Sequence, residues 1–402
     1  MISSEYTKGL LAEGRDTKIL LVVVDGLGGL PDPRTGKSEL DTAHLPNLDA
    51  LAASGSCGLI SPLGPGFTPG SGPAHLALFG YDPWKHQIGR GALSAMGLGL
   101  DFRAGDVAAR LNFCTVDDQG RVTDRRAGRI PTEKCAELCA VLAAIRIPGV
   151  EVCIAPEMEY RAAVVFRGEE LEDEVSDSDP QVTGVPPHAL EVRGKGSARM
   201  VQVANAFLDQ ARQILRGEQP ANMVLIRGFG RYPVLPQMGA IYGLKALAIA
   251  GYPMYRGVAS AVGMETVETD WHLDQELAVL QARWSGCDFV YLHIKKTDSA
   301  GEDGDFSRKV SLLEEVDQYV PKFLELKPEV FVLTGDHSTP SIMRSHSWHP
   351  VPLVLKSPWA MPDGLPGFSE RHCRAGSLGQ LPSTAVMALA LAHARRLEKF
   401  GA

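Results

Sequence analysis

Near the C-terminal end of the sequence, one stretch collects several side chains that can bind a metal ion or carry a proton. The segment TGDHSTPSIMRSHSWHP directly follows an apolar run and holds Asp336, His337, His346 and His349. Carboxylate oxygens and imidazole nitrogens suit Mn²⁺, Zn²⁺ and Mg²⁺. A polar surface loop would also explain this stretch taken alone, so the question is whether other ligand-type residues join it.

Two further apolar runs also end in acidic residues. ILLVVVDG (residues 19–26) ends at Asp25, and DFVYLHI (residues 288–294) runs into KKTDSAGED, which holds Asp298 and Glu302. Such short, continuously apolar runs are typical of strands buried on both faces. A single strand ending in Asp indicates no more than a turn or a helix cap. Three strands that end in this way are harder to explain by capping.

The elements between these runs indicate how the acids could meet. LPNLDALAASG (residues 45–55) and FSRKVSLLEEVDQYVPKFLEL (residues 306–326) have helical patterns, and VPLVL (residues 351–355) is a fourth strand. Alternating strands and helices predict an α/β fold, a mostly parallel sheet with helices on both faces. Ligands bind beyond the carboxyl ends of such strands. Carboxylates gathered there would repel one another without cations, so we expect two divalent ions, with structural coincidence as the alternative.

A candidate nucleophile stands in FTPGSGPAHLALFGYDP (residues 67–83), a Gly/Pro-rich turn that runs into an apolar helix. Ser71 would lie at or near the helix N-terminus, where free N–H groups favour an anion. A plain N-cap serine is one alternative, and a serine hydrolase with His75 as the base is another. GSG does not match the GxSxG elbow, and a histidine one turn along points awkwardly for that role. We prefer a serine activated by a metal ion, which needs no histidine base.

Composition limits the class of protein. At 402 residues the chain exceeds what one hydrophobic core usually supports, so two domains are expected. The net charge of −8 argues against nucleic acid or an anionic membrane as a partner. Seven cysteines without a CxxC pattern predict reduced thiols, and Cys135 and Cys139, one helical turn apart, predict helix packing. Residues 1–18 lack a signal-peptide h-region, and no apolar run is long enough for a membrane span. We therefore expect a soluble cytoplasmic protein, a monomer or small homo-oligomer.

Between about residues 85 and 232 the pattern changes. Strand-like runs there alternate with loops and helices, and none ends in a metal-type cluster. We expect a smaller α+β domain inserted at residues 85–232, with residues 1–84 and 233–402 forming the metal-binding domain. Within the insertion, GRGALSAMGLGL (residues 89–100) is predicted to be a hinge or turn, and the acidic run EELEDEVSDSDP (residues 169–180) a solvated loop.

Arginines are concentrated in this middle section, namely at Arg125, Arg126, Arg161, Arg227 and Arg231. Surface arginines are mostly solvated charges. In an acidic protein, however, a stretch such as DRRAGR also has the character of a fork for phosphate or carboxylate.

Several ordered segments carry a resemblance to a known family: DGLGGLPDP, PGSGPAHLALFGYDP, GRGALSAMG, DVAARLNFCTV, DRRAGRI, YGLKALAIAGYPMYRG, KTDSAGEDGDF and TGDHSTP. They resemble the archaeal-type 2,3-bisphosphoglycerate-independent (cofactor-independent) phosphoglycerate mutases of the alkaline phosphatase superfamily. The resemblance runs from about residue 18 to the last strand. It implies an alkaline-phosphatase-like two-metal domain with an inserted substrate domain. It also implies that 3-phosphoglycerate and 2-phosphoglycerate are interconverted in glycolysis and gluconeogenesis through a phosphoserine, without 2,3-bisphosphoglycerate.

The resemblance also assigns roles to residues. Ser71 is the nucleophile, and one metal ion is held by Asp25, Ser71, Asp336 and His337. The second ion is held by Asp298, His346 and a residue one turn after Asp298. Mn²⁺ is the expected ion, with Mg²⁺, Zn²⁺ and Co²⁺ as alternatives.

For the substrate, a small phosphorylated carboxylate, the resemblance implies that the arginines of the inserted domain hold it: Arg125, Arg126, Arg161, Arg227 and Arg231. Lys245 is expected near the phosphoryl group that is transferred. Asp124 is a candidate for moving the hydroxyl proton.

The sequence departs from the family pattern at two positions. Family members commonly have a histidine where this chain has Glu302, and an acid where it has His349. Our hypothesis is that these two residues exchange ligand roles at one metal ion, which leaves the site with one carboxylate and one imidazole as before.

Other functions remain open on the same scaffold. One is a metal-dependent phosphatase or phosphotransferase that acts on another small phosphorylated carboxylate or on an amino-acid alcohol. A non-catalytic metabolite sensor is a further alternative, favoured only by the departure at Glu302 and His349.

Overall fold

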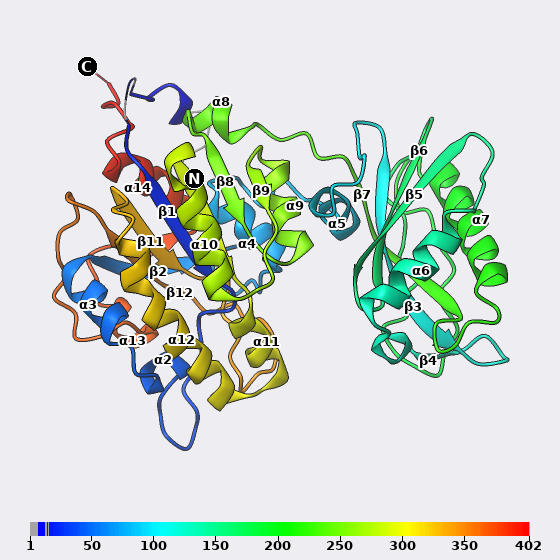
Figure 1. The fold of residues 1–402 in the computed structure, drawn as a ribbon, viewed down its shortest axis with the longest axis horizontal. Coiled ribbons are helices and arrows are strands. Elements are labelled where there is room, and N and C mark those ends of the chain that lie inside the picture. Colours follow the sequence, from blue (N-terminus) through cyan, green and yellow to red (C-terminus); the bar gives the residue numbers. More distant parts are fainter. Residues whose placement is uncertain (1–6, 13, 15, 402) are drawn as a thin grey trace. The chain divides into compact units, whose positions relative to one another are not determined.

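The computed structural model describes residues 7–12, 14 and 16–401. The chain forms two compact units: unit 1 spans Met1–Gln87 and Pro236–Ala402, and unit 2 spans Ile88–Leu235 (Figure 1). The N-terminal stretch in which we expect no targeting segment, residues 1–18, lies partly outside the described residues. Within the described ranges, no helix is both long and apolar enough to cross a bilayer.

Unit 1 is built on an eight-stranded sheet in which every strand except β12 runs in the same direction. In spatial order the strands are β13 (Gly379–Pro382), β2 (Ser56–Ser61), β12 (Val351–Lys356), β11 (Val330–Thr334), β1 (Ile19–Val24), β10 (Phe289–Ile294), β8 (Ala246–Ile249) and β9 (Glu265–Val267). The predicted α/β fold with a mostly parallel sheet is confirmed. All six residues of β1 and all six of β10 are buried, as their continuous apolar runs predict.

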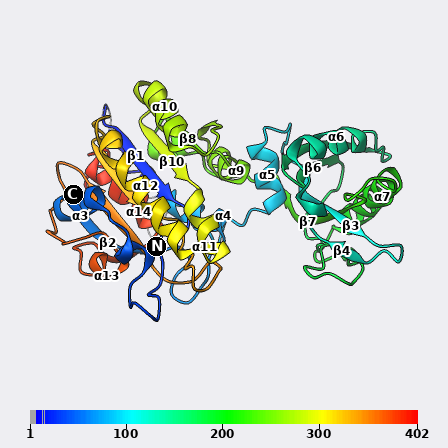
Figure 2. The same ribbon diagram turned by 60° about the horizontal axis from the view of Figure 1, so that its bottom comes forward.

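Helices cover both faces of this sheet, and Figures 1 and 2 show α10 and α12 on the side opposite α4 and α14. One group packs together as α2 (Glu39–Thr42), α3 (Pro46–Ser54), α10 (Leu273–Arg283), α12 (Phe306–Leu324) and α13 (Glu370–Cys373). The other group is α4 (Ser71–Leu78), α9 (Pro253–Ala261) and α14 (Ala385–His393). The remaining helical segments are α8 (Met238–Tyr242), α11 (Lys296–Asp303) and the 3₁₀ turn Trp284–Gly286.

Helix α12 illustrates why these segments are helical. The Asp305 side chain accepts a hydrogen bond from the Arg308 N–H and caps the helix start. Leu313, Val316 and Val320 recur at helical spacing on the buried side. The helix therefore buries an apolar stripe where it packs with α2, α3 and α10.

The strand order brings the carboxyl ends of three acid-bearing strands together. β11, β1 and β10 are adjacent and parallel, so the segments that follow them leave from the same edge. β12 is antiparallel to β11, so the connection between them, residues 335–350, lies at that edge as well. β2 runs parallel to β11, and its carboxyl end leads to α4.

Unit 2 contains a five-stranded antiparallel sheet around β3 (Figure 1). Its strands are β3 (Val107–Val116), β4 (Val122–Asp124), β5 (Val150–Met158), β6 (Arg161–Gly168) and β7 (Met223–Arg231). Its helical segments are α5 (Arg90–Gly97), the 3₁₀ turn Ala127–Arg129, α6 (Thr132–Leu142) and α7 (Ala198–Ile214). Cys135 and Cys139 of α6 are buried in the core between the sheet, α6 and α7, as predicted, and all seven cysteines are free.

Two predictions about unit 2 are wrong. Residues 89–100 are not a hinge or turn, because Arg90–Gly97 form α5. Its glycine at position 91 serves close packing, since a Cβ there would lie 2.3 Å from the Ala109 Cα. The acidic run is not a solvated loop either, because Ser176, Ser178 and Asp179 are buried. The Ser178 N–H donates to the Ile226 carbonyl of β7 at 2.9 Å, which holds this segment along the strand.

A buried carboxyl in unit 1 predicts how stability changes with pH. Burial raises the pKa of Glu276 on α10 to about 8, from an ordinary value of 4.5. When the pKa of an acid is higher in the folded protein than in the unfolded protein, its contribution to stability is complete below the pKa of the unfolded state. This contribution is lost as the pH rises through the pKa of the folded state. We expect the free energy of unfolding to fall by a few kcal/mol between pH 4.5 and 8, and Glu276→Gln to remove that fall.

Urea unfolding followed by tryptophan fluorescence measures this change. All five tryptophans lie outside residues 88–235, so the signal reports unit 1. Exposed Glu325→Gln is the matched control and is expected to follow the parent. Parallel curves for the Glu276→Gln variant and the parent would contradict the prediction.

Candidate metal centre and nucleophile

Ligand-type side chains from three neighbouring strand ends meet at the carboxyl edge of the unit 1 sheet. Asp25 follows β1, Asp298 lies on α11 after β10, and Asp336 and His337 follow β11. Two overlapping groups could each hold a metal ion, Asp25 with Asp336 and His337, and Asp298 with His337 and His346. In each group the candidate ligand atoms lie within 4.8 Å of one another.

His346 joins the centre from the loop before β12. Its ring stacks on the His337 ring with centroids 3.6 Å apart. Its Nδ1 lies 3.0 Å from the Pro69 carbonyl oxygen, so an Nδ1–H donated there leaves Nε2 as the unprotonated nitrogen. Nε2 lies 3.6 Å from Asp298 Oδ1, facing the second group.

Ser71 is the first residue of α4, and its hydroxyl faces this centre. Ser71 Oγ lies 3.2 Å from His337 Nε2. The N-cap of α4 is Gly70, so the helix does not use the serine as a cap. His75 Nδ1 lies 2.8 Å from the Ser71 carbonyl oxygen, and burial lowers the pKa of His75 to about 3. His75 therefore contacts the backbone of Ser71 and is poorly placed to act as its base.

Lys295 lies among the acidic candidate ligands. Its Nζ donates to Asp25 Oδ2 at 2.9 Å and to Asp298 Oδ2 at 2.5 Å. Burial would lower the pKa of Lys295, but these carboxylates raise it well above its ordinary value. In turn, burial would raise the pKa of Asp25, but Lys295 and His293 lower it well below its ordinary value.

The remaining charge is unbalanced, because one lysine cannot neutralise three carboxylates. Burial and the charge of Asp25 raise the pKa of Asp336 well above its ordinary value. Burial lowers the pKa of His337 well below its ordinary value, so the imidazole is neutral and able to bind a metal.

The orphaned oxygens of this centre fit a cation. Asp25 Oδ1 and Asp336 Oδ2 are buried and accept no hydrogen bond from any described residue. A buried carboxylate oxygen without a donor is costly unless a cation binds it. Oxygen and imidazole ligands together suit divalent ions. The residues present therefore support binding of divalent metal.

A second layer of side chains orients these ligands. Thr339 Oγ1 donates to Asp298 Oδ1 at 2.8 Å and lies 3.0 Å from His337 Nδ1, which leaves His337 Nε2 free to face the centre. Lys309 is fully buried on α12, and its Nζ donates to the carbonyls of Gly28 at 3.0 Å and Thr339 at 2.9 Å. Lys309 thereby joins the loops that follow β1 and β11.

The two residues that depart from the family pattern are placed differently. Glu302 Oε1 lies 3.7 Å from His346 Nε2, at the rim of the centre, with its side chain 55% exposed. His349 Nδ1 lies 3.1 Å from Ser347 Oγ, and its ring stacks on Trp348. Neither belongs to the two ligand groups found among the described residues. The exchange of their roles stays a prediction.

The predicted position of Lys245 is wrong. It directly precedes β8, whose first residue pairs with the first residue of β10. Lys245 therefore lies at the amino edge of the parallel sheet, opposite the metal centre. Its backbone N–H donates to Asp288 Oδ2 at 2.9 Å, and this hydrogen bond joins the residues that precede β8 and β10. The lysine that does lie at the centre is Lys295.

In unit 2, two of the predicted substrate arginines converge on one buried acid. Arg125 Nε and Nη2 donate to Asp179 at 2.8 and 2.7 Å, and Arg227 Nη1 donates to it at 3.2 Å. The side chain of Asp179 is fully buried, whereas those of Arg125 and Arg227 are 26% and 23% exposed. Asp179 thus holds both guanidinium groups while part of each stays accessible.

The other predicted residues of unit 2 occupy separate places. Arg161 begins β6 and lies over the Tyr160 ring at 4.7 Å. Arg231 ends β7 and pairs with Glu172 at 2.7 Å. The side chain of Arg126 is exposed, and its N–H donates to Asp124 Oδ1 at 2.8 Å.

Asp124 also accepts the Gly128 N–H at 2.6 Å, so it holds the turn that carries Arg125 and Arg126. Its role in proton transfer, and the substrate contacts of the arginines, stay predictions.

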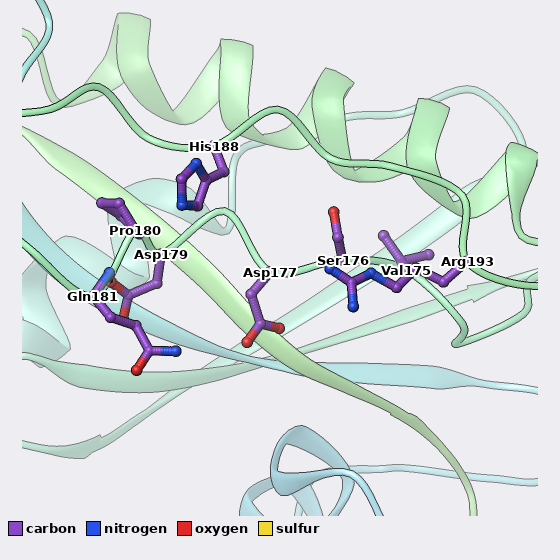
Figure 3. A pocket seen from close by; sticks show the side chains of 8 residues that line it. All are labelled: Val175, Ser176, Asp177, Asp179, Pro180, Gln181, His188 and Arg193. Carbon is purple, nitrogen blue, oxygen red and sulfur yellow. Dashed lines mark hydrogen bonds between the residues drawn. The ribbon is translucent and has the colours of Figure 1, made fainter.

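The acidic segment also lines a pocket of about 400 Å³ in unit 2 (Figure 3). Figure 3 shows Asp177, Asp179 and His188 around it. The pocket shares Asp179 with the arginine pair, but none of the predicted substrate arginines lines it. Asp177 Oδ1 accepts the Gly228 N–H at 2.7 Å, which ties the pocket wall to β7.

Several functional candidates were missed by sequence reasoning. Tyr255 donates to Asp25 Oδ2 at 2.5 Å, and His293 Nε2 lies 3.3 Å from the same oxygen. Lys295 and Tyr255 stand in or beside the segments KTDSAGEDGDF and YGLKALAIAGYPMYRG, which could have drawn attention to them. His293 and Lys309 are polar residues inside apolar patterns, and this signal indicates burial but not a partner.

The fold and the site define a class, that of metalloenzymes with a serine at the metal centre. A family model described as 2,3-bisphosphoglycerate-independent phosphoglycerate mutase matches residues 52–222. Proteins named "Probable 2,3-bisphosphoglycerate-independent phosphoglycerate mutase" from Thermus thermophilus and Aquifex aeolicus are 49% and 48% identical over 397 and 404 residues. Each alignment covers 98% of this chain and 98% of the relative.

Solved structures agree with this relationship. The cofactor-independent phosphoglycerate mutase from Thermoplasma acidophilum has a TM-score of 0.70 and 30% identity, covering 94% of this chain and 100% of that one. The PH0037 protein from Pyrococcus horikoshii has a TM-score of 0.84 and 28% identity, covering 97% of this chain and 100% of that one. The chain belongs to the 2,3-bisphosphoglycerate-independent phosphoglycerate mutase family.

Removing the Thr339 hydroxyl tests the second layer. Thr339→Val keeps the shape of the side chain but frees Asp298 and His337 to rotate, so we expect Mn²⁺ to bind about 10- to 100-fold more weakly. The affinity is measured by titrating chelator-treated protein with Mn²⁺ and following the free ion by electron paramagnetic resonance. The matched control is Thr334→Val on β11, whose hydroxyl donates to the Pro352 carbonyl at 2.8 Å. Equal affinities of the two variants would contradict the prediction.

Proposed function

We propose that this protein interconverts 3-phosphoglycerate and 2-phosphoglycerate through a phosphoserine at Ser71, in a metal-dependent reaction without 2,3-bisphosphoglycerate. The observation that carries the proposal is the position of the Ser71 hydroxyl, 3.2 Å from His337 Nε2, a candidate ligand in both metal groups. The names of the relatives support the choice of substrate.

The phosphoryl group passes through the serine in two steps. Ser71 Oγ loses its proton and forms a bond to phosphorus, while the bond from phosphorus to the glycerate oxygen breaks and that oxygen takes up a proton. The other glycerate hydroxyl then loses its proton and takes the phosphoryl group back, and Ser71 regains its proton, so the product is the isomer. Free N–H groups in the first turn of α4 stabilise the negative charge on the phosphoryl oxygens.

The proposal places one ion at Asp25, Asp336 and His337 with Ser71, and a second ion at Asp298 and His346. Glu302 and His349, which lie outside the two ligand groups, would complete the second site as the exchanged pair. Divalent ions held there would supply Lewis-acid stabilisation of the phosphoryl oxygens and would favour loss of the Ser71 hydroxyl proton. Mn²⁺ is the ion we propose, and a cytoplasmic place in glycolysis belongs to the same proposal.

Lys295 takes the role that the family resemblance implied for Lys245. Its ammonium group bridges Asp25 and Asp298 beside the serine-bearing site, where a positive charge stabilises a phosphoryl group in transfer. Tyr255, hydrogen-bonded to Asp25, keeps that carboxylate oriented.

The glycerate is held by arginines of unit 2. Arg125 and Arg227 are fixed by Asp179 and remain partly exposed, and guanidinium groups bind carboxylate and phosphate by paired hydrogen bonds. Arg126, Arg161 and Arg231 add positive charge in the same unit.

The defining experiment removes metal with a chelator, restores Mn²⁺ and supplies 3-phosphoglycerate without 2,3-bisphosphoglycerate. We expect 2-phosphoglycerate, followed by enolase coupling, with little free phosphate. Ser71→Ala should lower the rate by about 10³-fold or more, because it removes the atom that carries the phosphoryl group. Ser383→Ala, a buried serine at the start of α14, is the control and should keep the parent rate.

The assay also separates the alternatives. Free phosphate as the sole product would indicate a phosphatase. If the protein binds Mn²⁺ but forms neither 2-phosphoglycerate nor free phosphate, the result would indicate another phosphorylated substrate or a metabolite sensor.

The exchange of Glu302 and His349 predicts a pattern across variants. Glu302→Gln and His349→Gln should each lower the number of Mn²⁺ ions bound, measured by elemental analysis after gel filtration. The double variant Glu302→His with His349→Glu restores the family pattern and should bind Mn²⁺ as the parent does. Full metal occupancy and activity of Glu302→Gln would rule the exchange out.

A further inference from the structure

The two faces of the unit 2 sheet differ in character. On one face, Val107, Ala109, Leu111 and Phe113 of β3 join the core formed with α6 and α7. Because side chains alternate along a strand, Ala108, Arg110, Asn112 and Cys114 lie on the other face. The registers add Arg161, Ala163 and Val165 of β6 and Arg227 of β7 to that second face.

This second face is apolar at both ends and polar in the middle. Ala108 and Val165 pack under α5 at one end. Cys114 packs with Val122, Met223 and Leu225 at the other. The central band holds Arg110, Asn112, Arg161 and Arg227, and we call these four residues the polar band.

Asn112 lies between arginines in the polar band. It pairs with Arg161 across the β3–β6 register and with Leu225 across the β3–β7 register. The Arg110–Arg227 pair lies two register positions away, which makes it the next pair on the same face. Asn112 is only 9% exposed, and its Oδ1 is buried without a hydrogen-bond donor among the described residues. A buried amide oxygen without a donor destabilises a fold, so its presence points to a ligand.

A second orphaned acceptor lies close to the polar band. Glu157 Oε2 accepts from Arg110 Nε at 3.0 Å, and Glu157 Oε1 is buried without a donor within the described ranges. Glu157 stands at a register shift in β5 between Pro156 and Met158, and such bulges re-aim side chains. Ala163, opposite Arg110, is small enough to let the two side chains meet.

The donors and acceptors of the polar band and of neighbouring Glu157 define the ligand. Guanidinium groups match anionic oxygens, and the Asn112 amide oxygen and the Glu157 carboxylate oxygen match a hydroxyl donor. A ligand with anionic groups and a hydroxyl on a short skeleton satisfies both. A phosphorylated hydroxy acid has this composition. A phosphorylated acid that lacks the hydroxyl would leave the two acceptor oxygens unpaired.

We propose that Asn112 is a specificity-determining residue that accepts a hydrogen bond from the free hydroxyl of the phosphoglycerate held by the unit 2 arginines. The inference rests on the proposed function and adds the group that reads the hydroxyl. Asn112 selects the hydroxy acid over its deoxy analogue, while the arginines bind the anionic groups that both molecules share.

Binding of two ligands that differ in one hydroxyl tests this role. Full-length Mn²⁺-loaded protein with Ser71→Ala, which blocks turnover, is titrated calorimetrically with 3-phosphoglycerate and with 3-phosphooxypropionate, which lacks the hydroxyl. We call this Ser71→Ala protein the parent of the titrations. We expect it to bind 3-phosphoglycerate about tenfold more tightly than the analogue. Asn112→Ala should reduce this ratio to about one, mainly by weakening 3-phosphoglycerate.

Two further variants make the test specific. Asn112→Asp keeps an acceptor oxygen and should keep the preference, although its charge weakens both ligands. Exposed Asn205→Ala on α7 is the control and should behave as the parent. If Asn112→Ala fails to fold, loss of the preference in Asn112→Leu, with retention in Asn112→Asp, supports the same conclusion.

The outcomes separate this inference from the proposed function. An unchanged tenfold preference in Asn112→Ala, or in Asn112→Leu, would overturn the role of Asn112 while leaving the mutase intact. A parent that prefers neither ligand, yet forms 2-phosphoglycerate when Ser71 is present, would also overturn it. A parent that binds neither ligand and forms no 2-phosphoglycerate would overturn both.

Discussion

The structure of unit 1 depends on the burial of three carboxylates at one edge of a parallel sheet. Asp25, Asp298 and Asp336 are almost fully removed from water, and each would raise the free energy of the fold if left unpaired. Lys295 offsets part of the charge by bridging two of them. The opposite pKa shifts of Asp25 and Asp336 show how unevenly this one cation is shared. This excess of negative charge destabilises the metal-free protein, and for the same reason it favours the binding of divalent ions.

The chain holds this arrangement together through contacts between loops that are distant in sequence. Lys309 binds the carbonyls of Gly28 and Thr339, and Thr339 orients Asp298 and His337. The candidate ligands are therefore positioned by a packed helix and by backbone groups as well as by the loops themselves. A preorganised set of ligands loses little freedom when it binds an ion or a phosphoryl group.

Unit 2 uses a related device for positive charge. Asp179 fixes Arg125 and Arg227 from a buried position, and Glu157 fixes Arg110. Each acid neutralises part of the repulsion between guanidinium groups and leaves their outer N–H groups in a defined direction. The sheet face that carries Arg110 and Arg227 is polar in its middle and apolar at its ends, so the same strands build the core and the polar band.

The sequence alone determined the buried strands of unit 1 and the types of residue at their ends. Continuous apolar runs predicted β1, β10 and β11, and the acids at their ends predicted the metal centre, because strand propensity and residue type are local properties. Tertiary structure decided which residues meet. Lys295 pairs with Asp25 across 270 positions, and Asp179 pairs with Arg125 across 54, so no local pattern could choose Lys295 over Lys245 or bury the acidic segment. Strand order and register set those distances, and both depend on packing of the whole fold.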